Sequence, residues 1–464
     1  MRRRGCCACW SRSGNSNFPV TDYSVTEYSV REQRGWYLYD WANSAFVTTG
    51  VALFLGPYLT ALAKAAADAN GLVHPLGIPV DARSYWSYLV SLSVILQVLV
   101  LPIVGAGADY GHRKKQYLAV TAYAGAAAAT AMFWLQGSAY LWGGALFIFA
   151  NVSFGASVVV YNSFLPQIAP PEQRDAVSSR GWGIGYIGGG VLLALNLLLF
   201  LNAKRVGITE GMAVRISLSS SGVWWGVFTI PTLLTLRNRG PAHALPRGKR
   251  AVGAVAGQLR HTLADIRRYP QSMMFLIAYL LYNDAIQAVL ALASQFGNDE
   301  LKIPVSSLTM AILMVQFVGF FGAIGFEWVA AAVGAKRAIM VTLVLWTATL
   351  IYLFAWVYTT RAFFIAAAAV AIVMGGSQAL SRSLFAQLIP KGKEAEYFSI
   401  YEVSDKGTSW ISPLVFGLAL QMTHSYREAI LSLIIFFIAG LVVLTRVDVQ
   451  RGALDAQTAD AQRM

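Results

Sequence analysis

Charged residues are scarce in this sequence. Of its 464 residues, 13% are Asp, Glu, Lys or Arg, whereas an average soluble domain has about 25%. Hydrophobic residues make up 56%, which is too much for a soluble fold to bury and too much for a chain that remains disordered. The composition therefore excludes a nucleic-acid-binding module and most soluble enzymes. It favours a protein that crosses a membrane several times.

Cysteine and histidine are also rare. The three cysteines, Cys6, Cys7 and Cys9, lie close to the N-terminus, so no disulfide framework holds the apolar part of the chain. The 5 histidines are scattered, and the sequence contains no nucleophile–base set, metal-binding motif or phosphate-binding loop. We therefore expect neither an enzyme nor a site for a cofactor or a metal.

The sequence is instead built from long apolar runs. We count twelve, each long enough to cross the hydrocarbon core of a bilayer, which takes about 20 residues. This pattern predicts an all-α integral membrane protein with twelve transmembrane helices. The runs cover approximately residues 35–63, 84–108, 117–136, 139–166, 178–201, 214–236, 272–296, 305–332, 338–358, 361–389, 397–421 and 427–446.

The longest polar break inside the chain follows the sixth run and divides the runs six and six. This break predicts two six-helix bundles joined by a linker, with a polar tail at each end. The predicted parts are an N-terminal tail (1–33), an N-terminal bundle (34–236), a linker (237–271), a C-terminal bundle (272–446) and a C-terminal tail (447–464).

Basic residues gather on one side of the predicted bundles. The net charge is +13, and most Lys and Arg residues lie in the two tails, the linker and the loops on the same side. Cytoplasmic loops of membrane proteins carry such an excess of Lys and Arg. We therefore expect both termini in the cytoplasm.

The two halves of the chain repeat parts of each other. The fourth and tenth runs end in similar sequences, and an ordered set of tyrosine, acid and amide occurs in both the first and the seventh run. A six-plus-six duplication with a basic central loop is typical of major facilitator transporters. The positions that coincide at an offset of 220 are Ser163, Gln167 and Pro170 with Ser383, Gln387 and Pro390.

The loop after the second run begins at Gly105 and contains Asp109, Arg113 and Lys114. It resembles the loop between the second and third helices of major facilitator transporters, in which glycines allow a tight turn and an acid caps a helix or pairs with a base. We expect this cluster to latch the two halves on the cytoplasmic side. In the second half, Glu327 corresponds to Asp109. The alternative is a polar loop that only sets the topology.

Two acids lie inside apolar runs, where burial of an ionisable group is costly and indicates function. Asp40 in the first run and Asp284 in the seventh are candidates for proton coupling, because a carboxyl in a cavity can load and release a proton as access alternates. Asn43 and Gln287 lie about one turn further along the same helix faces and can hydrogen-bond a solute. The alternative is that each acid only holds a neighbouring helix.

A second group of charges lies near the cytoplasmic ends of the tenth and eleventh runs. Arg382 shares its depth with Glu402 and Asp405, and Lys406 lies one turn after Glu402. A pair between Arg382 and one of these acids would form a gate, a site for a substrate carboxylate or a purely structural contact. Arg180, at the start of the fifth run, is a further gate candidate.

Gly181, Gly185 and Gly189 recur every four residues on one face of the fifth run. This spacing lets another transmembrane helix approach closely. We expect the facing surface to be the glycines of the eighth run, within 319–325.

Several stretches together resemble the vacuole-effluxer-like family of the major facilitator superfamily, also called the autophagy-related amino-acid effluxers. The resemblance extends from about residue 34 to 446, and it implies twelve helices that alternate access between two bundles. Fungal members are associated with amino-acid export from the vacuole, and the short loops of this chain are those of a bacterial inner-membrane member. The stretches that carry the resemblance are Trp36–Phe46, Asn162–Pro166, Gly181–Gly189, Tyr282–Asp284, Gly375–Ser383 and Thr408–Trp410.

The sequence thus predicts a secondary transporter for a small polar solute, an amino acid according to the resemblance, with proton coupling. Its expected partners are the bilayer, the solute and protons, with no nucleic acid, and we expect a monomer. The alternatives are export of drug-like or lipid-like amphiphiles and a non-transporting membrane sensor or scaffold. The residues expected to line the cavity are Asn43, Asn162, Asp284, Gln287, Gln378 and Arg382.

Overall fold

The structure is a computed structural model, and it describes a helical protein with one small β-hairpin. The described residues are 29–82, 85–109, 113–239, 269–303, 305–390, 393–407, 415–416, 419, 422–423 and 425–461.

The first part of the chain, up to the linker, is referred to as the N-half. It consists of α1 (Val30–Ala45), the π-helical η1 (Phe46–Phe54), α2 (Leu55–Ala66), β1 (Leu72–Val73), η2 (Pro75–Gly77), β2 (Val80–Asp81), α3 (Tyr85–Asp109), α4 (Lys114–Ala131), η3 (Met132–Trp134), α5 (Tyr140–Asn162), α6 (Leu165–Ile168), η4 (Pro171–Gln173), α7 (Arg174–Leu201) and α8 (Glu210–Thr235).

The second part, after the linker, is referred to as the C-half. It consists of α10 (Pro270–Gln295), η6 (Phe296–Glu300), α11 (Val305–Val333), α12 (Ala335–Trp356), α13 (Thr360–Gln387), α14 (Glu394–Gly407), α16 (Tyr426–Ser432), α17 (Ile434–Thr445) and α18 (Val449–Ala461).

Within the part of the chain that the structure describes, 10 helices are long and apolar enough to cross a membrane. The first span joins α1, η1 and α2 into one helix, Val30–Ala66. α8 is not among the ten, because Arg215 and four serines between positions 217 and 221 lower its hydropathy. The predicted run 397–421 lies only partly within the described residues, so the number of twelve stays a prediction.

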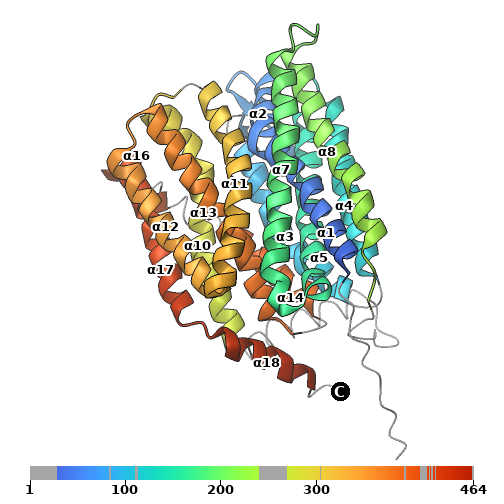
Figure 1. Ribbon diagram of the computed structural model, residues 1–464. Coiled ribbons are helices and arrows are strands. Elements are labelled where there is room, and N and C mark those ends of the chain that lie inside the picture. The colour runs from blue at the N-terminus through green and yellow to red at the C-terminus, as the bar shows by residue number, and fades with distance from the viewer. Residues whose placement is uncertain are drawn as a thin grey trace, which may run out of the picture.

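The two halves lie side by side with their long helices roughly parallel to a common axis (Figure 1). The N-half and C-half meet where α7 packs against α11 and α13, and where α14 packs against α3. The end of the molecule at which α18 lies is called the α18 side, and the opposite end, beyond α2, is called the hairpin side. The polar C-terminal tail predicted from the sequence contains α18, which lies across the end of the C-half (Figure 1).

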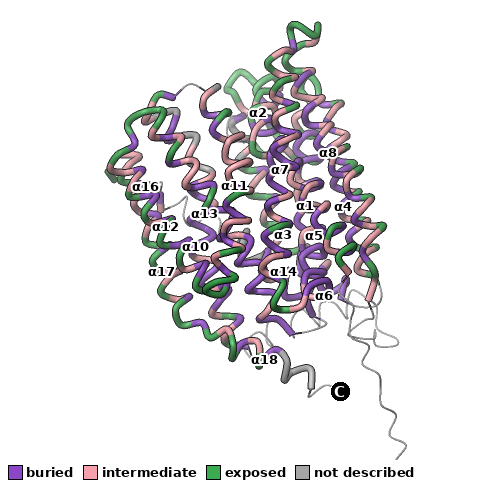
Figure 2. Tube along the Cα trace, viewed as in Figure 1, coloured by how far each residue is buried: buried purple, intermediate pink, exposed green. Residues whose placement is uncertain are grey.

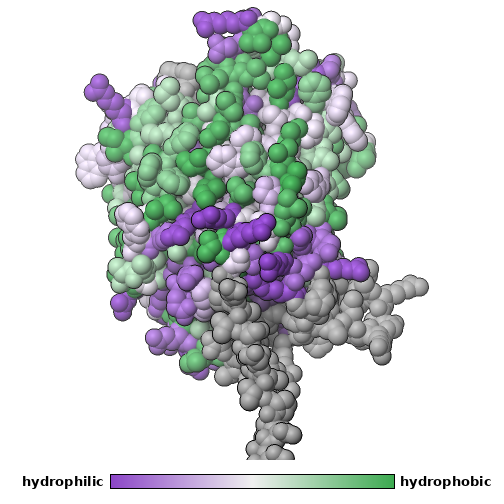
Figure 3. Space-filling model, turned by 45° about the vertical axis from the view of Figure 1, so that its right-hand side comes forward, coloured by the Kyte–Doolittle hydropathy of each residue, from purple (hydrophilic) through white to green (hydrophobic). Residues whose placement is uncertain are grey.

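On the face drawn in Figure 3, hydrophobic side chains cover most of the surface, and hydrophilic ones gather toward the α18 side. Buried residues are dense around α6 and α14, where the halves meet (Figure 2). This distribution fits a protein whose outer face contacts lipid and whose polar groups lie inside or at the ends.

The glycine row of α7 packs on α1, and not on the glycines of α11 as the sequence suggested. A Cβ atom at Gly319 would meet Tyr186, and one at Gly322 would meet the backbone of Ile372 in α13. The α7 row is close to α1 because small residues let two helix backbones approach. The nearest side chains to added Cβ atoms at Gly181, Gly185 and Gly189 include Asp40, Ser44 and Thr48.

At Gly188, one residue before the last glycine of the row, the backbones of α7 and α1 also approach closely. A Cβ there would lie 2.6 Å from the carbonyl oxygen and 2.8 Å from the Cα of Trp41. Because this neighbour is backbone, we expect Gly188→Ala to force α1 and α7 apart and to cost about 1–3 kcal/mol of stability. Thermal unfolding in detergent measures this loss. Gly325→Ala is the matched control, since a Cβ at Gly325 meets nothing within 4 Å. Equal unfolding temperatures for the two variants would contradict this packing.

Candidate functional site

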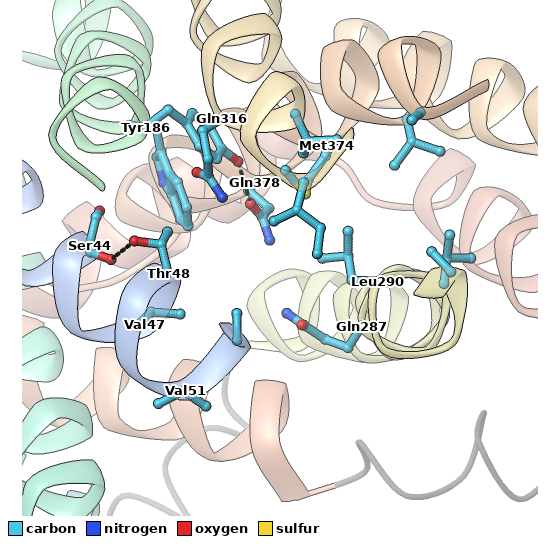
Figure 4. Close-up of a pocket in the computed structure, with 18 of the residues that line it drawn as sticks. Ser44, Val47, Thr48, Val51, Tyr186, Gln287, Leu290, Gln316, Met374 and Gln378 are labelled. Carbon is cyan, nitrogen blue, oxygen red and sulfur yellow. Dashed lines mark hydrogen bonds between the residues drawn. The ribbon is translucent and has the colours of Figure 1, made fainter. Parts of the chain in front are cut away.

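A cavity of about 820 Å³ lies between the two halves. Its walls toward the hairpin side are largely apolar, with residues such as Leu290, Ile312 and Leu353. Polar groups of the two halves face one another across it, with Thr48 on one side and Gln287 and Gln378 on the other (Figure 4). The charged and amide side chains of the lining are Asp40, Asn43, Asn162, Gln287, Gln316, Gln378, Arg382 and Glu402.

All five residues that the sequence suggested as substrate contacts, namely Asn43, Asn162, Gln287, Gln378 and Arg382, belong to this lining. Asp284 does not, in contrast to the expectation. It is buried in α10, with 2% of its surface exposed, and is not among the residues that line the cavity. The two candidate acids therefore have different surroundings, although the sequences around them are alike.

The α18 end of the cavity is closed by an ion pair between the halves. Arg382 of α13 donates from Nη1 to Oδ2 of Asp40 in α1, at 3.2 Å, and both side chains are almost fully buried. Tyr161 donates its hydroxyl to the same carboxylate oxygen at 2.7 Å. Two further Arg382 donors bind Ser178 of α7, from Nε to Oγ at 2.8 Å and from Nη2 to the carbonyl oxygen at 2.7 Å.

Aromatic rings enclose this guanidinium. Its central carbon lies 4.7 Å from the ring centre of Trp36 and 5.4 Å from that of Trp182. Cation–π contacts of this kind strengthen when water is excluded. Because a buried charge that loses its partner costs about 3–5 kcal/mol, the pair is a strong constraint on the position of α13 against α1.

The partner of Arg382 differs from the expectation. The sequence suggested Glu402 or Asp405, which share its depth, but the structure pairs Arg382 with Asp40. Glu402 instead accepts a hydrogen bond from Asn162 Nδ2 at 3.1 Å, which also joins the two halves. The side chains of Asp405 and Lys406 lie outside the described residues.

A second contact between the halves lies nearer the middle of the cavity. Tyr186 of α7 donates its hydroxyl to Oε1 of Gln378 in α13 at 2.9 Å (Figure 4). The contact is formed by neutral groups, so breaking it costs less than breaking the ion pair.

The loop cluster predicted as a latch does join the halves. Lys114 lies 2.8 Å from the Asp109 carboxylate and 3.0 Å from that of Glu394 in α14. Asp109 also accepts a hydrogen bond from the backbone N–H of Glu396 at 2.8 Å, in the first turn of α14, where an acid is favoured by the helix dipole.

Two further members of the predicted latch have different positions. Gly105 is the point at which α3 approaches α14, because a Cβ there would lie 2.5 Å from the carbonyl oxygen of Ala395. Arg113 is exposed and only precedes α4. The basic member of the latch is therefore Lys114.

Arg180 and Glu327, which the sequence treated as separate gate candidates, pair with each other at 3.0 Å across α7 and α11. Arg180 is about half exposed, and water weakens an ion pair at the surface, so this pair adds little to the stability of the closed α18 side.

Arg174 and Asp175 at the start of α7 also join the halves, although the sequence did not indicate them as candidates. Arg174 donates to the carbonyl oxygens of Ala169 and Ala386, at 3.2 and 2.7 Å. Asp175 accepts from the hydroxyl of Ser383 in α13. Polar residues are common at the start of a helix, so the position of these two residues did not draw attention. Nothing in the neighbouring sequence indicates that their partners lie in the other half.

These contacts between the halves close the cavity on the α18 side. Among the described residues, no group of three or more His, Cys, Asp or Glu could hold a metal ion. The arrangement can change in one evident way: the pairs between the halves can separate, which would expose the cavity on the α18 side.

The latch gives a first test of this closure. Lys114→Gln leaves Asp109 and Glu394 buried without their cation, so the closed state loses stability. We expect labelling of a buried cysteine between the halves to become roughly tenfold faster or more, since about 1.4 kcal/mol corresponds to a factor of ten. The reporter is Ala386→Cys, with Cys6, Cys7 and Cys9 replaced by Ser, and maleimide labelling is the measurement. Lys115→Gln is the control with the same change of charge, and equal rates for both variants would contradict the latch.

Comparison with known proteins agrees with this architecture. The family described as "Vacuole effluxer Atg22 like" matches residues 28–457. An uncharacterized MFS-type transporter of Bacillus subtilis, YxiO, is 30% identical, over 89% of this chain and 94% of its own. Autophagy-related protein 22-1 of Penicillium rubens is 26% identical, over 96% of this chain and 94% of its own.

Two solved structures show the same fold. The proton:xylose symporter XylE, of the major facilitator superfamily, superposes with a TM-score of 0.70 at 11% identity, over 93% of this chain and 98% of its own. A bacterial homologue of the iron transporter ferroportin, in an outward-facing state, superposes with a TM-score of 0.64 at 14% identity, over 90% of this chain and 98% of its own. The chain is a multi-pass membrane transporter of the major facilitator type, and it belongs to the Atg22-like vacuole effluxer family.

Proposed function

We propose that this protein is a secondary active transporter that moves amino acids across the membrane by alternating access, coupled to protons through Asp40. The observation that carries the proposal is the buried Asp40–Arg382 pair, which lines the central cavity and joins the two halves. One pair of residues can therefore respond to a proton, contact a solute and hold the α18 side closed.

The proton acts on the pair through charge. When Asp40 is ionised, its carboxylate neutralises Arg382 and holds α13 against α1. A proton on Asp40 removes the attraction between the two charges and leaves the guanidinium with neutral hydrogen-bond partners, among them Ser178. Because an unpaired buried cation is costly, the protonated state favours separation of the halves on the α18 side.

The solute is proposed from the charges of the lining. An amino acid carries one carboxylate and one ammonium group, and the cavity contains Arg382 together with Asp40 and Glu402. The carboxylate of the solute would bind Arg382 when Asp40 is protonated, and Glu402 with Asn162 would meet the ammonium group. The cavity volume of about 820 Å³ falls in the range of small-molecule sites, about 300–1,000 Å³.

A second candidate is export of drug-like or lipid-like amphiphiles. The extensive apolar wall of the cavity, for example Val315, Val370 and Met374, favours it. The charged lining at the α18 end favours the amino acid.

The remaining parts of the proposal rest on the sequence. We propose two six-helix bundles, a monomer and both termini in the cytoplasm of a bacterial inner-membrane protein, from the duplication, the distribution of basic residues and the short loops. On this assignment the α18 side faces the cytoplasm, and the structure is closed to it.

Counterflow in proteoliposomes tests the proposal. Vesicles with purified protein are loaded with one amino acid at a time, and uptake of the labelled form is followed with and without a pH gradient. We expect a subset of amino acids to exchange and to accumulate with the gradient. Asp40→Asn removes the protonatable group, so its gradient-driven accumulation should fall to the level of protein-free liposomes.

Asp284→Asn is the matched control, because it removes a buried carboxyl that does not line the cavity. We expect it to retain the response to the gradient. Loss of this response in Asp284→Asn but not in Asp40→Asn would overturn the assignment of Asp40. Folded protein that exchanges no amino acid but exports an amphiphilic dye would favour the second candidate.

A further inference from the structure

A second hollow lies on the outer surface of the N-half, apart from the central cavity. It has a volume of about 430 Å³ and is bounded by η3, α7 and α8. Val223 and Val227 on its rim are about half exposed, so the hollow opens outward, where the surface is apolar. We call it the α8 groove; its lining includes Phe133, Leu192, Ile216, Val223, Trp224 and Phe228.

The dimensions of the α8 groove match one leaflet of a bilayer. It extends along α8 from Ile216 to Phe228, which is about 18 Å at a rise of about 1.5 Å per residue. The hydrocarbon part of one leaflet is about 15 Å thick, half of about 30 Å. An acyl chain aligned with α8 would therefore occupy the groove over its whole length.

Positive charge lies at the hairpin-side end of the groove. The guanidinium of Arg215 lies 5.8 Å from the centre of the Phe133 ring, which lines the groove, and donates to the Phe133 carbonyl oxygen at 3.4 Å. Trp134, the next residue, is 66% exposed, which is typical of a side chain at the membrane interface. Arg215 is therefore at the depth of lipid head groups.

The loop before α8 increases this charge. Lys204 and Arg205 are exposed there, and Glu210 lies 3.9 Å from Lys204. Basic side chains at the membrane surface attract anionic lipids, each by about 1 kcal/mol.

We propose that the α8 groove binds one anionic phospholipid, with its phosphate at Arg215 and an acyl chain along Leu192, Val223 and Phe228. The apolar groove fits the chain, and the basic end fits the charge of the head group.

The groove also contacts α1, the helix that carries Asp40. Trp224 in its wall donates from Nε1 to the carbonyl oxygen of Trp41 at 3.2 Å, and the two indole rings stack at 5.6 Å. Trp41 directly follows Asp40 in α1. A bound lipid would hold Trp224 against α1, so transport should depend on the head group. This last step rests on the proposed function, whereas the binding itself does not.

Native mass spectrometry in detergent tests the binding. The purified full-length protein is mixed with equal amounts of dioleoylphosphatidylglycerol and dioleoylphosphatidylcholine. We expect adducts of the anionic lipid to predominate. Arg215→Gln removes the positive charge at the head-group end of the groove, so the affinity for phosphatidylglycerol should fall roughly tenfold and its advantage over phosphatidylcholine should disappear. Val223→Trp fills the groove without a change of charge and should lower binding of both lipids.

Arg361→Gln is the matched control, because Arg361 is an exposed basic residue at the hairpin side of the C-half. We expect it to bind both lipids as the unaltered protein does. Unfolding temperatures identify any variant that fails to fold. If Arg215→Gln fails to fold, Arg215→Lys takes its place, and we expect its affinity for phosphatidylglycerol to lie between those of the unaltered protein for the two lipids. The proposal is overturned by equal binding of the two lipids to the unaltered protein, by equal losses in Arg215→Gln and Arg361→Gln, or by unchanged binding in Val223→Trp.

Discussion

The closed side of this transporter depends on one buried ion pair, Asp40 with Arg382. Two charges placed in a low-dielectric interior must compensate each other, because separating them without another partner costs about 3–5 kcal/mol. Here the two charges belong to different halves of the molecule. The cost of separating these charges is therefore part of the cost of separating the halves, and an event that neutralises Asp40 lowers that cost.

The surrounding sequence makes this pair possible. Gly181 leaves space for it, since a Cβ there would lie 2.7 Å from the Asp40 carboxylate and 3.1 Å from Arg382. Tyr161 and Ser178 satisfy the remaining polar atoms, so the charges are buried with partners on several sides.

The other links at the α18 side differ in chemistry and depth. The Asp109–Lys114–Glu394 cluster is ionic and lies where the loops begin, whereas Tyr186 with Gln378 is neutral and lies in the cavity. Trp224 of the α8 groove contacts the carbonyl oxygen of Trp41, one residue from Asp40, so the lipid-facing surface adjoins the same element.

The sequence predicted a helical protein that crosses the membrane several times, and it predicted most of the charged and amide residues of the cavity lining. Polar residues are so rare within the apolar runs that Asp40, Asn43, Asn162, Gln287, Gln378 and Arg382 stood out as candidates, and all of them line the cavity. The loop motif similarly predicted that Asp109 and Lys114 lie at a contact between the halves.

The residue with which each charged side chain pairs could not be predicted in the same way. Sequence position gives the depth of a residue in the membrane but not the direction of its side chain within the bundle. Arg382 shares its depth with Glu402, yet it turns toward α1 and pairs with Asp40. Asp284 lies in a sequence similar to that of Asp40, yet it is buried in α10 and is not in the lining.

The most direct test of the account is the distance between the halves on the α18 side as a function of pH. Spin labels at the exposed positions Glu172→Cys and Arg337→Cys, in a chain whose three native cysteines are replaced by Ser, report this distance by pulsed electron paramagnetic resonance. The account predicts that acidification adds a population at longer distance, and that Asp40→Asn shows this population already at neutral pH with no further response to acid. The same distance distribution in both proteins at every pH would contradict it.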